Sequence, residues 1–98
     1  MEGAETEGGV RELREKIDAV DLQLVRILNE RARLVQEVVA AKAASGKQLF
    51  DPKREEEILR RVAEQNEGPI YDSSMREIFE LILHRIRDIE MQREGSSG

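Results

Sequence analysis

Hydrophobic residues recur every three to four positions in three segments of the chain, the spacing of one face of an α-helix. The longest segment runs from about Val10 to about Ala44 and contains neither proline nor internal glycine. Its apolar stripe consists of Leu13, Ile17, Val20, Leu24, Leu28, Val35 and Val38. No segment shows the alternation of a β-strand, so the sequence predicts an all-α fold of a long, a short and a medium helix.

The two shorter segments have helix boundary signals. Asp51 is a suitable N-cap for the second helix, and Pro52 is suited to its first position. The turn residues 66–69 should end this helix. The third helix should begin at Ser73–Ser74, where Ser74 and Glu77 fit a capping box, and should fray near Gln92. Its predicted apolar face consists of Met75, Ile78, Phe79, Ile82, Ile86 and Ile89.

The ends of the chain differ from this helical core. Residues 1–9 are small, acidic and aperiodic, and the chain ends in a run of Gly and Ser. Both compositions are typical of segments without a packed structure. We therefore expect a disordered tail over 1–9, one domain over 10–92, and a flexible tail or linker over 93–98.

The first helix predicts an oligomer. At 1.5 Å per residue it is roughly 50 Å long, whereas a compact domain of this size is only about 33 Å across. Its apolar stripe must then extend beyond a single-chain core. Another copy of the same stripe would cover it, so we expect an intertwined homodimer.

Composition excludes several classes of function. The chain has 98 residues, a net charge of −5 and no cysteine. The acidic balance argues against nucleic-acid binding, and the missing thiols exclude disulfides and thiolate metal sites. No signal peptide, membrane-spanning stretch or glycine-rich phosphate loop is visible, and the one histidine, His84, should face solvent. We expect a cytoplasmic protein.

Two cations lie on the apolar stripe of the first helix. Arg31 and Lys42 are eleven residues apart, which turns them by only about 20° relative to each other. A buried cation is costly unless an anion pairs with it. The alternatives are ion pairs across a helix interface, or long side chains that reach back to water.

Three more charges continue apolar stripes. Arg54 and Glu55 each lie one helical turn before an apolar residue of the second helix, so both extend its apolar stripe toward the start of the helix. Glu90 lies one turn after Ile86 on the third helix. Each of these charges alone has a simpler explanation. Arg54 could lie on the surface, Glu55 could interact with the helix dipole, and Glu90 could belong to a frayed helix end. Together with Arg31 and Lys42 they form a mostly cationic set that suits a small anion with carboxylate or phosphate groups.

Five stretches resemble the all-helical AroQ-class chorismate mutases, from about Val10 to Glu90. They are LREKIDAVD (13–21), LNERARLVQEV (28–38), AAK (40–42), FDPKREEEIL (50–59) and IFELI (78–82). The resemblance implies an enzyme that rearranges chorismate to prephenate by a concerted pericyclic shift. It implies no cofactor, no metal and no covalent intermediate, in keeping with a chain that offers no clear nucleophile.

The resemblance also assigns roles to the first helix. Arg31 would hold one carboxylate of chorismate, and Arg14 would reach the other carboxylate from the partner subunit. Around the helix axis, Arg14 lies about 100° away from Arg31, which agrees with a separate role for Arg14. Lys42 would donate to the ether oxygen and to a carboxylate.

The second helix would supply the wall beside the ring hydroxyl of the substrate. Glu55 would accept a hydrogen bond from that hydroxyl, while the backbone at Asp51 and the side chain of Arg54 would complete the wall. In the third helix, Ile86 stands where some members have serine. Glu90 stands where many bacterial members have glutamine, which the resemblance implies is the second donor to the ether oxygen. A carboxylate donates a hydrogen bond only when protonated, so we expect activity to fall as the pH rises.

Three alternatives are consistent with the same residues. An isochorismate-pyruvate lyase would use nearly the same cationic pocket. A prephenate- or chorismate-sensing domain fused to a 3-deoxy-heptulosonate-phosphate synthase would bind without much catalysis. A helical coiled-coil dimer without any site would leave the cations on the stripes unexplained.

Overall fold

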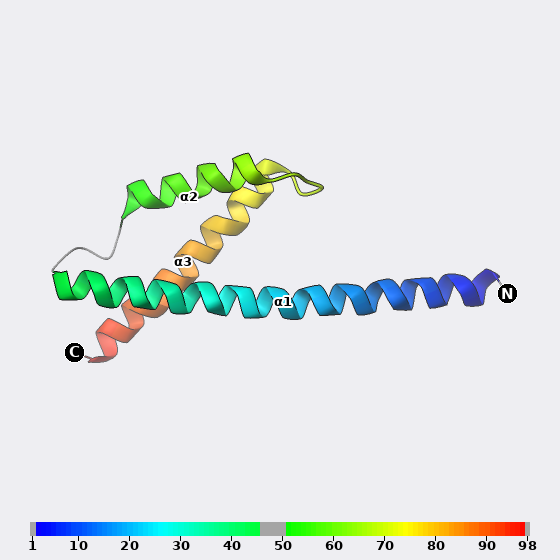
Figure 1. Ribbon diagram of the computed structural model, residues 1–98, viewed down its shortest axis with the longest axis horizontal. Coiled ribbons are helices and arrows are strands. Elements are labelled where there is room, and N and C mark those ends of the chain that lie inside the picture. The colour runs from blue at the N-terminus through cyan, green and yellow to red at the C-terminus, as the bar shows by residue number, and fades with distance from the viewer. Residues whose placement is uncertain (1, 46–50, 98) are drawn as a thin grey trace. The chain divides into compact units, whose positions relative to one another are not determined.

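The computed structural model describes the backbone of residues 2–45 and 51–97, and the side chains of residues 9–44 and 51–89. Within these ranges it contains three helices and no strand: α1 (Glu2–Ser45), α2 (Pro52–Gln65) and α3 (Asp72–Ser97) (Figure 1). The predicted all-α fold and the order of helix lengths are confirmed. None of the described helices is long and apolar enough to cross a membrane.

The chain divides into two compact units, residues 1–34 and 35–98. α1 is one continuous helix of 44 residues, about 66 Å long, that runs through both. It begins at Glu2, so the predicted start near Val10 is wrong by eight residues. The predicted start rests on the periodic spacing of apolar residues, which residues 2–9 lack. A helical backbone does not require such spacing. The domain bounds 1–9, 10–92 and 93–98 remain predictions.

α1 leaves most of its described apolar side chains exposed in the single chain. Leu13, Ile17 and Val20, on the predicted stripe, are 58, 57 and 52% exposed. Leu22 and Ile27, which lie off that stripe, are each 58% exposed. The apolar surface of α1 is therefore broader than the predicted stripe, and every described side chain from residue 9 to residue 30 is exposed.

α2 and α3 form a helical hairpin whose core is small (Figure 1). Leu59 of α2 is 7% exposed, and Leu83 and Ile86 of α3 are 8 and 9% exposed. The predicted face of α3 is thus partly wrong, because it omitted Leu83 and included Ile78 and Ile89, which are 44 and 52% exposed. α3 has apolar residues on several sides, so spacing alone does not select the side that packs on α2.

The ends of the hairpin helices are fixed by side chains. Asp51 caps α2 as predicted, with its carboxylate 3.0 Å from the backbone N–H of Arg54. In the loop, Asn66 donates to the Ile70 carbonyl at 2.6 Å and to the Asp72 carboxylate at 2.8 Å. α3 begins at Asp72 and continues to Ser97, so the predicted start at Ser73–Ser74 is one to two residues late and the predicted end near Gln92 is too early.

Candidate active site

Half-buried side chains follow one side of α1. They are Arg31, Ala32, Val35, Gln36, Val39 and Lys42. At 100° per residue this set covers an arc of about 140°, and both cations lie near one edge of the arc. A cation at the edge of a half-buried face can contact a bound anion while its aliphatic stem packs on apolar neighbours.

The first turn of α2 holds three of the predicted residues close together by its capping geometry. The backbone N–H of Glu55 donates to the Asp51 carbonyl at 3.1 Å, and Asp51 also accepts from the Arg54 N–H. The Arg54 side chain is 52% exposed and lies 3.6 Å from the Glu57 carboxylate. Arg54 therefore lies on the surface of the single chain, whereas the Glu55 side chain is only 24% exposed.

Glu55 has a partner that is not among the predicted site residues. Nη1 of Arg87 donates to Oε2 of Glu55 at 2.8 Å, which links α3 to the start of α2. The signal for Arg87 was present, because Arg87 lies one turn after Leu83 just as Glu90 lies one turn after Ile86. The predicted apolar face omits Leu83, so the charged residue one turn after it is not among the predicted site residues.

The last two predicted positions belong to α3. Ile86 is 9% exposed and precedes Arg87 directly, so it fixes the α3 backbone in the hairpin core beside the ion pair. Glu90 follows one turn later in the same helix. Its side chain lies outside the described residues.

Arg14 and Arg31 belong to the first unit of the chain, and the other predicted residues belong to the second. Arg14 is exposed, as expected of a side chain that would serve a partner subunit. The assembly of all these residues into one site remains a prediction.

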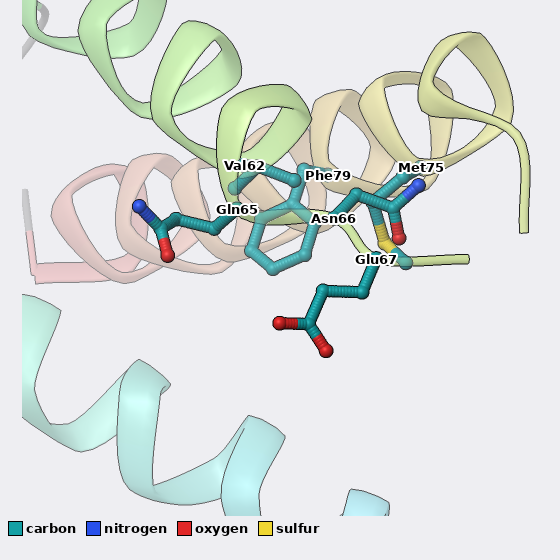
Figure 2. A pocket seen from close by; sticks show the side chains of 6 residues that line it. All are labelled: Val62, Gln65, Asn66, Glu67, Met75 and Phe79. Atoms are coloured by element: carbon teal, nitrogen blue, oxygen red, sulfur yellow. The ribbon is translucent and has the colours of Figure 1, made fainter.

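A hollow lies at the loop end of the hairpin, away from the first turn of α2 (Figure 2). Its volume is about 340 Å³, and Figure 2 shows the Phe79 ring beside Val62 with the amide of Gln65 directed away from the ring. Glu67 is the one charged residue of its lining, which is completed by Asn66 and Met75. Because the lining has no cation, the hollow is unsuited to a dianionic ligand.

Comparison with protein families gives one match to most of the chain. The family model described as chorismate mutase type II matches residues 13–91. This match confirms the resemblance on which the expected activity depends.

Curated relatives agree with the family model. The chain is 31% identical over 77 residues to a bifunctional chorismate mutase/prephenate dehydratase of Neisseria gonorrhoeae, which covers 79% of this chain and 21% of the relative. The enzyme of the same name from Stutzerimonas stutzeri is 33% identical over 79 residues, or 76% of this chain and 22% of that protein. The chain thus spans about a fifth of the length of these relatives.

Solved structures extend the agreement to the fold. Chorismate mutase of Thermus thermophilus is 38% identical in two structures, described as form I and form II. Form I gives a TM-score of 0.77 over 79% of this chain and 96% of that one, and form II gives 0.80 over 84% and 93%.

Proposed function

Because the chain belongs to the chorismate mutase type II family, we propose that it rearranges chorismate to prephenate with the residues described above. The reaction breaks the ether C–O bond and forms a C–C bond in one concerted step. It needs neither proton transfer nor a nucleophile, so binding geometry and electrostatics can supply the catalysis.

One observation supports this proposal beyond the family match: Arg31 and Lys42 are both half-buried on one side of α1, in a protein of net charge −5. Two cations on the same side of a helix place positive charge where a small anion can bind. Chorismate carries two carboxylates and an ether oxygen that gains negative charge in the transition state. Arg31 would bind a carboxylate, and Lys42 would donate to the ether oxygen.

The start of α2 would bind the opposite side of the substrate. Glu55 already accepts a hydrogen bond from Arg87, and its carboxylate has the capacity to accept another from the ring hydroxyl. The capping turn of Asp51 holds the backbone around Glu55 in place, and Arg54 would turn toward the site when substrate binds. These contacts would hold the flexible molecule in its reactive chair-like form.

We also propose a homodimer with two shared sites, each with Arg14 from one chain and the remaining residues from the other. The exposed apolar surface of α1 supports this arrangement, because such a surface in water needs a partner. A cytoplasmic location remains a prediction, which cell fractionation would test.

The direct test is the loss of chorismate ultraviolet absorbance in the presence of purified protein. We expect turnover by the unmodified chain and a loss of about 100-fold or more in kcat for Lys42→Met, the size found when a transition-state donor is removed. Lys53→Met is the matched control, because Lys53 is an exposed lysine of α2, and its kcat should stay within about twofold. Equal kcat values for the two variants would contradict the proposed role of Lys42.

Two alternatives are separated by the same preparation. Release of pyruvate from isochorismate, without loss of chorismate, would identify a lyase. Prephenate binding without turnover would identify a sensing domain, which the bifunctional relatives make worth testing since this chain spans about a fifth of their length.

A further inference from the structure

The ion pair between Glu55 and Arg87 differs from the other ion pairs described in α2 and α3. Its N–O distance is 2.8 Å, and the two side chains are 24 and 31% exposed. The pair between Arg76 and Glu56 joins the same two helices at 3.0 Å, but its side chains are 41 and 65% exposed. A charge-assisted hydrogen bond of 2.8 Å that is partly withdrawn from water fixes its partners more firmly than an exposed pair.

Both backbones beside this pair are held. On α2, the N–H of Glu55 is bonded to the Asp51 carbonyl in the capped first turn. On α3, Ile86 directly before Arg87 is buried in the hairpin core. The pair therefore joins two rigid points, and the remaining freedom of Glu55 lies in its side-chain torsions.

Arg87 removes much of that freedom. A glutamate side chain loses rotamer entropy when it is ordered, and a carboxylate that nothing holds would lose that entropy during substrate binding. The hydrogen bond that Arg87 donates to Glu55 goes to Oε2. The other oxygen, Oε1, retains its lone pairs for a hydroxyl donor.

We propose that Arg87 is a positioning residue that holds Glu55 by one oxygen, so that the other oxygen is aligned for the ring hydroxyl of the substrate. This role depends on the proposed function, because it acts only through Glu55. Arg87 itself would not contact the reacting atoms.

Arg76 provides a matched control. Arg76 and Arg87 are eleven residues apart on α3, which places them on the same side within about 20°, and their partners Glu56 and Glu55 are adjacent on α2. Arg76→Met thus removes an ion pair of the same chemistry between the same helices, together with a longer ion pair of 3.8 Å to Glu80 within α3. It leaves Glu55 and Arg87 unchanged.

The experiment is a double-mutant cycle in kcat/KM for chorismate. Arg87→Met should lower kcat/KM about tenfold, whereas Arg76→Met should stay within about twofold. In a Glu55→Ala background, Arg87→Met should have an effect of less than about twofold, because the group that it positions is gone. Urea unfolding of each variant shows whether the hairpin is intact.

A second substitution guards against loss of folding in Arg87→Met. Arg87→Lys keeps the charge and should recover part of the lost kcat/KM, since an ammonium can still donate to Oε2 but lacks the planar fork. An Arg87→Lys variant that folds and is as impaired as Glu55→Ala would contradict positioning through charge-assisted bonding.

The remaining outcomes distinguish the two proposals. If the unmodified chain has no chorismate turnover, the proposed function fails, and the role of Arg87 fails with it. If the unmodified chain is active but Arg87→Met and Arg76→Met have the same kcat/KM, only the positioning role is wrong. The same conclusion follows if Arg87→Met lowers kcat/KM by the same factor with and without the Glu55 side chain.

Discussion

Glu90 is the residue whose chemistry fits the proposed reaction least directly. The ether oxygen of chorismate gains negative charge as its C–O bond breaks, and a charged carboxylate near it would oppose that change. A protonated carboxyl group would instead donate a hydrogen bond. Activity should therefore be highest at low pH, where Glu90 carries its proton, and should decline as the pH rises and the proton is lost.

The substitution Glu90→Gln tests this expectation. Glutamine donates at every pH, so the variant should keep a nearly constant kcat from about pH 4.5 to about 8.5 while the unmodified chain loses activity over that range. Glu77→Gln, an exposed change in the same helix, should keep the pH profile of the unmodified chain. An identical profile for Glu90→Gln and the unmodified chain would show that Glu90 does not donate.

At the scale of the helix, the sequence predicts where the helices lie better than it predicts which of their side chains are buried. Asp51 and Pro52 marked the start of α2 correctly, because capping is a local interaction between a side chain and the next turn. The packed side of α3 was less predictable, since the stretch IFELIL places apolar residues almost all around the helix. Which of them is buried depends on α2, and that information lies outside the segment itself.

The candidate site shows the same limit. Arg31 and Lys42 were identified because they interrupt a clear stripe, and both are half-buried. Arg87 was missed because its row begins at Leu83, which spacing did not place in the core. A residue that acts through a contact between two helices is visible only when both helices are placed.

The hairpin core gives a prediction at this scale. Leu83→Ala should lower the free energy of unfolding by about 2–4 kcal/mol, because it removes a side chain that is only 8% exposed from a small core. Arg85→Ala, whose side chain is 74% exposed, should change it by less than about 0.5 kcal/mol. Urea unfolding followed by circular dichroism, at one protein concentration, measures both. A loss below about 1 kcal/mol for Leu83→Ala would contradict the assigned core.

At the scale of the whole molecule, the proposed shared sites predict complementation between two inactive variants. Arg14→Ala and Lys42→Met chains would each form dimers in which both sites lack one group. A mixed dimer would have one site that lacks both groups and one site that is intact. Unfolding and refolding an equimolar mixture should therefore restore about a quarter of the unmodified activity, since half of the dimers are mixed and each has one working site.

The control for complementation is a mixture of Lys42→Met with Glu55→Ala. Both of these residues would come from the same chain of each site, so every site in the mixed dimer would lack one of them. That mixture should stay inactive. Equal recovery in the two mixtures, or none in either, would contradict the sharing of Arg14 between subunits.

The proposed dimer contact through the exposed apolar surface of α1 would make folding depend on the concentration of the protein. If a second chain covers that surface, folding and association are one equilibrium, and every tenfold dilution removes about 1.4 kcal/mol of stability per mole of dimer. The melting temperature should then fall steadily on dilution, unlike that of a monomer. A cell that makes little of this protein would have less of it folded, so expression level would set the active fraction as well as the total.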